Sequence, residues 1–134
     1  MTEPAATVAG LRSVDLGVTD VAAQARFYTD VWNLAVVAER DGSVYLRASG
    51  GHHHVLALHP RPQPALLRVD LAAADRGAVE ALHRRVLRMG VAGVQPPAAV
   101  DEPGGGYAFA FADPEGRVLR VIAGDERHAD AALV

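Results

Sequence analysis

The sequence contains no cysteine among its 134 residues. Disulfides, thiolate zinc sites and cysteine nucleophiles are therefore excluded together, and any metal would have to be bound by His, Asp or Glu. The sequence also lacks an apolar run long enough to span a bilayer, and residues 1–10 lack the basic start and hydrophobic segment of a signal peptide. These absences lead us to expect a cytoplasmic protein with no membrane partner.

A strong charge of one sign is missing as well. The formal net charge is −3 and 50% of the residues are hydrophobic, which predicts one folded domain without the positive field of a nucleic-acid-binding protein. Gly104-Gly105-Gly106 lacks the lysine and the strand-to-helix context of a phosphate-binding loop. The serines Ser13, Ser43 and Ser49 occur in no nucleophile-elbow pattern, so the usual grounds for a serine hydrolase are absent.

What the sequence does contain is a regular succession of strand and helix patterns. Residues 11–18 alternate apolar and polar, which predicts a strand with one face against a core. Thr19-Asp20 supplies the N-cap of a helix that ends near Trp32, with Asn33 in a left-handed turn. Three short strands are then predicted at 35–39, 44–47 and 53–59.

The second half of the chain repeats the first. After a stiff connector at Pro60–Pro64, Arg68-Val69-Asp70-Leu71 echoes Ser13-Val14-Asp15-Leu16 at an offset of 55 residues (69 − 14). A helix is predicted from Asp75 to Met89, with Gly90 ending it. The expected apolar stripe of this helix consists of Val79, Leu82, Val86 and Met89. Strands are predicted at 94–100, 107–112 and 118–123, so each half has the order βαβββ.

Several short motifs of the chain are similar to those of one superfamily. Phe27-Tyr28 followed by Trp32-Asn33-Leu34, and the turn Asp113-Pro114-Glu115-Gly116 before the last strand, resemble the glyoxalase, bleomycin-resistance and extradiol-dioxygenase (vicinal-oxygen-chelate) superfamily. The resemblance implies an α+β fold in which two βαβββ modules, 11–59 and 65–124, form curved mixed sheets around a cavity. The domain would then span 11–124, between a flexible N-terminus at 1–10 and a tail or interdomain linker at 125–134.

Within that superfamily, the stretches 28–32, 43–47 and 53–58 most resemble the amino-terminal, metal-free domain of two-domain extradiol ring-cleavage enzymes. The metal-ligand positions implied by the family fall here on Ser13, Arg68 and Arg120. Arginine presents no lone pair and a serine hydroxyl is a poor ligand, so we predict no metal site and no catalytic residue in this chain. A tyrosine of the extradiol signature is replaced by Ala110.

Polar residues on the predicted strands are the candidates for binding. Alternation places five side chains on the faces that line the cavity: Ser13, Asp15, Arg68, Asp70 and Arg120. The first interpretation is an ion-pair network that fills the place of a lost metal, because unpaired charges there would be costly to desolvate. The alternative is that Arg68 and Arg120 clamp the carboxylate or phosphate of a small ligand.

Two further features have an ordinary and a functional interpretation. His52-His53-His54 precedes a predicted strand, where successive residues face opposite ways, so adventitious binding of nickel or zinc is favoured over a catalytic site. His83 is expected to face solvent. Trp32 is expected to be a core anchor, with a dimer contact as the alternative.

The resemblance implies three functional hypotheses. The first is an oxidoreductase domain, the non-catalytic amino-terminal half of a catechol-cleaving dioxygenase whose Fe(II) lies in a partner catalytic domain. The second is a stand-alone protein of the bleomycin-resistance type that binds or sequesters a small aromatic or anionic molecule. The third is a single-domain metal-dependent lyase or isomerase. A homodimer, or packing against a second glyoxalase-like domain, is expected because two-module domains leave sheet edges that need cover.

Overall fold

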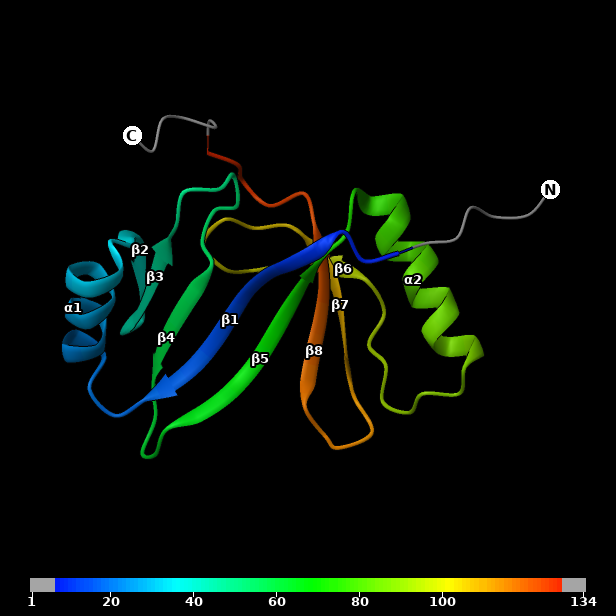
Figure 1. The fold of residues 1–134 in the computed structure, drawn as a ribbon. Coiled ribbons are helices and arrows are strands. Elements are labelled where there is room, and N and C mark those ends of the chain that lie inside the picture. The colour runs from blue at the N-terminus through cyan, green and yellow to red at the C-terminus, as the bar shows by residue number, and fades with distance from the viewer. Residues whose placement is uncertain (1–6, 129–134) are drawn as a thin grey trace.

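The fold is a single mixed sheet flanked by two helices, seen in a computed structural model that describes residues 7–128 (Figure 1). The first module contains β1 (Gly10–Val18), α1 (Val21–Trp32), β2 (Ala35–Arg40), β3 (Ser43–Arg47) and β4 (Leu56–Pro60). The second contains β5 (Ala65–Ala72), α2 (Arg76–Arg88), β6 (Ala98–Ala99), β7 (Tyr107–Ala112) and β8 (Val118–Ala123). The eight strands lie in the order β2-β3-β4-β1-β5-β8-β7-β6. The predicted α+β class and the βαβββ repeat are both confirmed.

Both helices begin at the residues that the sequence predicts. The carboxylate of Asp20 accepts a hydrogen bond from the backbone N–H of Ala23 at 3.0 Å, and Asp75 accepts one from Ala78 at 2.8 Å. Asn33 has a φ of 57° and its N–H donates to the carbonyl of Tyr28, which ends α1 in the left-handed turn expected there. The capping residues thus fix where each helix meets the sheet.

The two modules meet at the centre of the sheet, where β1 and β5 run antiparallel. Val14 lies directly opposite Val69, its equivalent at the offset of 55 residues. Each central strand then pairs in parallel with the last strand of its own module, Leu56 opposite Val14 and Leu119 opposite Val69. The repeat in the sequence is therefore an approximate two-fold repeat in the structure, and side chains of β1, β5 and β8 are brought side by side.

Each module has its own apolar core. The first cluster consists of Val18, Val44, Leu46, Leu56 and Leu58, packed against side chains of α1. The second consists of Ala73, Val79, Leu82, Phe109, Val121 and Ala123, packed around α2. Because strand side chains alternate, the other face of the sheet is left for the polar residues of β1, β5 and β8.

Two predicted strands differ from the observed ones. The strand expected at 94–100 is reduced to Ala98–Ala99, since Pro96 and Pro97 have no N–H to donate to a ladder and Gly93 has a φ of 71°. The strand expected from residue 53 begins only at Leu56, because the preceding residues form a bend. That bend turns His53 and His54 into the interior.

Three side chains were placed wrongly by helical periodicity. Trp32 is 65% exposed and does not anchor the core, and Phe27, Val31 and Val36 are exposed as well. His83, expected to face solvent, is half-buried with its ring 5.2 Å from that of Phe109. Met89 is 71% exposed, since α2 ends at Arg88 and Met89 is the C-cap.

Neither helix of the described residues, 7–128, has the length and hydropathy needed to cross a bilayer.

Candidate functional site

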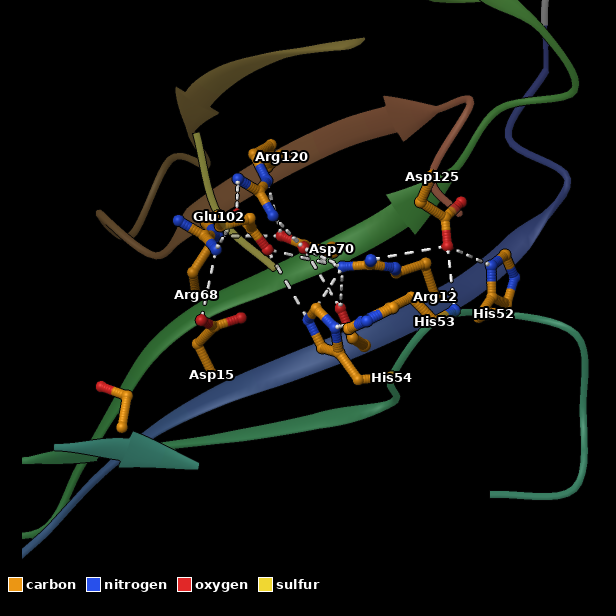
Figure 2. A network of polar contacts seen from close by, with 12 residues as sticks. Arg12, Asp15, His52, His53, His54, Arg68, Asp70, Glu102, Arg120 and Asp125 are labelled. Atoms are coloured by element: carbon orange, nitrogen blue, oxygen red, sulfur yellow. Dashed lines mark hydrogen bonds and ion pairs between the residues drawn. The ribbon is translucent and has the colours of Figure 1, made fainter. Parts of the chain in front are cut away.

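The five predicted cavity residues converge: Figure 2 shows Asp15, Arg68, Asp70 and Arg120 pointing toward one another, and Ser13 donates a hydrogen bond to Asp70. Register explains the convergence: Asp70 lies opposite both Ser13 on β1 and Arg120 on β8, and Asp15 lies opposite Arg68. Each charged residue therefore has an oppositely charged residue on the neighbouring strand. The ion-pair network of the first interpretation is what the structure contains.

Asp70 is the centre of this network and is 0% exposed. Its Oδ1 accepts from Nε of Arg68 at 2.9 Å and from Nε of Arg120 at 3.1 Å. Its Oδ2 accepts from Nη2 of Arg120 at 2.6 Å, from Nη1 of Arg12 at 3.2 Å and from the Ser13 hydroxyl at 3.1 Å. One carboxylate thus holds three guanidinium groups and a hydroxyl together.

Arg120 is fully committed to this network. Two of its nitrogen atoms form a fork on Asp70, and Nη1 donates to Oε1 of Glu102. Burial favours the neutral form, but the hydrogen bond with Glu102 and the charge of Asp70 outweigh it and raise the pKa of Arg120. A clamp on an external anion needs free N–H groups on Arg68 and Arg120 together, and each guanidinium nitrogen of Arg120 already has a partner.

Arg12 joins the network although strict alternation would turn it toward the core with Val14. The register between β1 and β5 shifts between Leu11 and Ser13, so two successive side chains, Arg12 and Ser13, reach Asp70. Arg12 is 1% exposed and also contacts Asp125, at 3.5 Å from its Nη2. A bulge gives no clear signal in sequence periodicity, which is why Arg12 was missed.

His54 is buried against Arg12 in the neutral form. Burial, then the charges of Arg12 and His53, lower the pKa of His54 to about 3. Nη1 of Arg12 lies 3.2 Å from Nε2 of His54, and since a guanidinium can only donate, Nε2 accepts. The proton of His54 is then on Nδ1, which donates to Nδ1 of His53 at 2.9 Å.

Three segments outside the strands close one end of the cavity. The N–H of Glu126 donates to the carbonyl of Gly104 and that of His128 to the carbonyl of Gly51, so 124–128 lies across the loops of 48–55 and 100–106. Gly104 has a φ of 90°, and a Cβ there would lie 2.6 Å from Cγ of His53, so only glycine fits. The described part of the predicted tail or linker is therefore held in place; 129–134 lie outside the described residues.

Asp125 anchors that closed end. Its Oδ2 accepts from the backbone N–H of His53 at 3.1 Å and lies 3.5 Å from Nη2 of Arg12. Burial alone would raise the pKa of Asp125, but the backbone hydrogen bond and the charge of Arg12 lower it. Glu102, His54 and Asp125 all come from loops, where neither period of alternation applies. In the sequence, His54 is singled out only as part of the His52–His54 run, and none of the three residues was predicted to belong to this network.

Three side chains, Ser43, His59 and Asp15, form a hydrogen-bonded series at the other end of the cavity. The Ser43 Oγ lies 2.7 Å from Nδ1 of His59, whose Nε2 lies 2.8 Å from Oδ2 of Asp15. Nη2 of Arg68 donates to the same oxygen at 3.2 Å. Although burial opposes it, the hydrogen bond from His59 and the charge of Arg68 lower the pKa of Asp15, which keeps it ionised.

A pocket of about 290 Å³ opens beside His59 and Asp15. Among the predicted residues only Asp15 and Arg68 line it, whereas Ser13, Asp70 and Arg120 are buried and are not part of its lining. The lining residues are Asp15, Tyr45, His59, Arg61, Leu67, Arg68, Glu102 and Val118.

The residues at the family's ligand positions do not fit a metal ion. Guanidinium groups occupy two of the three positions, and Ser13 donates its proton to Asp70. Oδ1 of Asp15 and Oε2 of Glu102 have no hydrogen-bond partner, but within residues 7–128 no third His, Asp or Glu joins them in a group that could hold a metal. A catalytic transition-metal site usually needs three such protein ligands.

Comparisons with known proteins agree with this fold. Residues 10–121 match the family described as Glyoxalase/Bleomycin resistance protein/Dioxygenase superfamily. No curated protein sequence matches significantly. The Mn(II)-bound glyoxalase from Novosphingobium aromaticivorans is 35% identical, with a TM-score of 0.85 over 95% of this chain.

Two dioxygenases are similar in fold alone. A variant of homoprotocatechuate 2,3-dioxygenase from Brevibacterium fuscum is 24% identical, with a TM-score of 0.83 over 96% of this chain. The 2,3-dioxygenase LapB from Pseudomonas sp. KL28 is 16% identical, with a TM-score of 0.79 over 92% of this chain. The chain spans only 42%, 37% and 42% of the length of the glyoxalase and these two dioxygenases, respectively.

Proposed function

Since the chain belongs to the glyoxalase/bleomycin resistance protein/dioxygenase superfamily, we propose that it is the non-catalytic, amino-terminal half of an aromatic-ring-cleaving dioxygenase. In this proposal the domain supports the catalytic half, shapes the access of a catechol-type substrate and contributes oligomer contacts. Fe(II) and the reacting substrate belong to the other half. The relative lengths of the similar structures are in keeping with such an arrangement, since each extends well beyond one such domain.

The observation that carries the proposal is that an ion-pair network occupies the family's metal position. Arg68 and Arg120 stand at two ligand positions and are bound to Asp70, which is 0% exposed. Removing one partner from such a network would leave buried charges unpaired and cost about 3–5 kcal/mol, so the folded domain retains these side chains at the metal position. A metal-dependent lyase or isomerase, the third hypothesis, needs ligands at these positions, and a sequestering protein needs a wide pocket where this network lies.

Metal content tests the proposal directly. We expect untagged protein, purified without a metal column and incubated with Fe(II) or Mn(II), to retain less than roughly a tenth of an equivalent, because two ligand positions carry guanidinium groups. Mass spectrometry of the metals, together with a spectrophotometric catechol-cleavage assay, measures this. A homologous extradiol dioxygenase handled in parallel is the positive control. One bound equivalent of metal, with or without ring cleavage, contradicts the proposal.

We propose that the exposed side chains of Phe27, Val31, Trp32 and Val36 form one apolar patch, through which the domain packs against a second glyoxalase-like domain or a second copy. Val31 is 64% and Trp32 65% exposed, and α1 has no fully buried residue. The patch adjoins β2, an edge strand with an unpaired ladder. Large apolar side chains beside an open edge are typical of interaction surfaces.

Sedimentation analysis measures whether the chain self-associates through this patch. We expect the isolated chain to self-associate with rising concentration, and Trp32→Ser to shift the equilibrium at least roughly tenfold toward the monomer, since a buried aromatic anchor contributes more than 1 kcal/mol to an interface. Leu87→Ser, which removes a half-exposed leucine on α2, is the matched control and should leave the equilibrium unchanged. A wild-type chain that stays monomeric at all concentrations contradicts the use of this patch between two copies of the chain.

A further inference from the structure

We propose that the pocket beside Asp15 binds a small organic carboxylate, held by Arg68, Arg61 and Tyr45. Arg68 stands at one of the family's ligand positions, whereas Arg61 and Tyr45 do not. The inference goes beyond the proposed role in a dioxygenase and holds whether or not that role is correct. It rests on three hydrogen-bond donors that line one pocket and have capacity left over.

Arg68 is the first donor, and the network fixes its orientation. Nε donates to Asp70 at 2.9 Å and Nη2 to Asp15 at 3.2 Å, so one edge of the guanidinium plane is occupied. Nη1 has no hydrogen-bond or ion-pair partner within residues 7–128, and the side chain is 25% exposed. Two N–H groups are therefore held in place at the wall of the pocket with nothing to receive them, which lowers the entropy cost of binding an anion.

Arg61 is the second donor, and a glycine positions it. Its Nη1 donates to the carbonyl of Pro60 at 2.8 Å, and its aliphatic stem lies against β1 at Gly17. A Cβ on Gly17 would lie 2.7 Å from Cγ of Arg61, so the absence of a side chain there lets the arginine lie flat along the rim. Nε and Nη2 of Arg61 have no partner among the described residues.

Tyr45 is the third donor. The residue is 6% exposed, its ring packs edge-on against those of His54 and His59, and its hydroxyl forms no hydrogen bond with the part of the chain that the structure describes. Burial, and then the charges of Glu102 and Asp15, raise the pKa of Tyr45, so the hydroxyl keeps its proton and can donate.

The ligand class follows from what is already satisfied. Oδ2 of Asp15 is held by His59 and Arg68, and Oε1 of Glu102 by Arg120. The second oxygens of both carboxylates, which have no hydrogen-bond partner, are buried and not open to a ligand. The unused groups at the pocket wall are therefore the donors of two guanidinium groups and one phenol. Planar carboxylates match guanidinium geometry through two parallel oxygens. Leu67 and Val118 supply apolar walls, and about 290 Å³ suits a small organic acid.

Isothermal titration with benzoate tests the inference. Benzamide, its neutral analogue of the same shape, and inorganic phosphate are the comparison probes. We expect one saturable benzoate site per chain, little binding of benzamide, and weaker binding of phosphate. Arg61→Gln and Tyr45→Phe should each weaken benzoate binding roughly tenfold or more, the effect typical of losing a hydrogen bond to a charged group. Neither side chain belongs to the buried network around Asp70, so circular dichroism should show both variants folded.

Arg88→Gln, on the exposed end of α2, removes the same charge far from the pocket and should bind benzoate as the wild type does. Several outcomes overturn the inference: no saturation of the wild type by about 10 mM benzoate, which is weaker than an ordinary millimolar site; equal binding of benzamide; an equal loss in Arg88→Gln; or unchanged affinity in both pocket variants. Phosphate binding as tight as that of benzoate overturns the assignment to a planar carboxylate.

Discussion

Asp70→Asn is expected to lower the free energy of unfolding by about 3–5 kcal/mol, the usual cost of breaking a buried ion pair by removing one partner. Asparagine keeps the shape of the side chain but not its charge. Arg12, Arg68 and Arg120 would then face only Asp15, Glu102 and Asp125, with the guanidinium fork of Arg120 pointing at a neutral amide. Urea denaturation followed by circular dichroism at constant pH measures the loss.

The matched control is Asp101→Asn. Asp101 is 92% exposed on its side chain and forms one ion pair, with Arg40 at 3.1 Å, so a loss of at most about 1 kcal/mol is expected. In the double variant, Asp70→Asn with Arg120→Gln, the loss of unfolding free energy should be smaller than the sum of the two single losses. The reason is that the second change removes a guanidinium left without its partner. Additive losses, or a loss below about 1 kcal/mol for Asp70→Asn alone, would show that the network contributes little.

The second large effect is on the dependence of stability on pH. The pKa of His54 is lowered from 6.5 to about 3 by burial, Arg12 and His53. In the unfolded chain the imidazole takes up a proton near pH 6.5, whereas in the folded protein it stays neutral to about pH 3. Its contribution to stability is therefore complete above pH 6.5 and is lost as the pH falls through that interval, by up to about 1.4 kcal/mol per pH unit.

We expect the free energy of unfolding to fall by about 2 kcal/mol or more between pH 6.5 and 5 in the wild type. The slope of this free energy against pH measures how many protons the chain takes up on unfolding, and in His54→Gln that number should be smaller by close to one. Urea denaturation at half-unit pH intervals measures both. Above pH 7, where neither state protonates this histidine, the two curves should run parallel, which separates the slope from any constant loss in the variant. Equal slopes below pH 6.5 would mean that the proton uptake on unfolding belongs elsewhere.

The carboxylates act in the same direction at lower pH. The pKa values of Asp15 and Asp125 are both lowered in the folded protein, so their contributions are present above the ordinary value of 3.8 and are lost as the pH falls below it. Acid therefore weakens the network in two steps, first through His54 and His53 and then through the aspartates. The pKa of His53 is lowered mainly by burial, which adds to the first step.

Periodicity was a good guide wherever the chain forms a ladder or a capped helix. The strands at 107–112 and 118–123 have the predicted bounds, and Asp20, Asn33 and Asp75 cap the helices as expected. A strand period of two also brought the five polar candidates to one face, because β1, β5 and β8 are neighbours. These features are local or follow from the repeat of the chain, so one sequence is enough to predict them.

Residues that reach the site by irregular backbone could not be found in this way. Arg12 is turned inward by a bulge, and Glu102, His54 and Asp125 come from loops whose course depends on tertiary contacts such as His128 with Gly51. Trp32 shows the converse error, since helical spacing says which side chains share a face of α1 but not whether a neighbour covers that face. Which face is covered, and which loop residues reach the site, depends on tertiary packing and not on the periodicity of the sequence.

The two apolar clusters share no residue, and each closes around the helix of its own module. Between them lie the β1 and β5 ladder and the charges around Asp70. Apolar contacts stabilise each module, whereas backbone hydrogen bonds and ion pairs cross the boundary between the two modules. Solvent conditions affect these two kinds of interaction differently. Acid protonates the carboxylates at the boundary between the modules and leaves both apolar clusters unchanged, so it should weaken the contact between the modules before it loosens either helix from its own strands.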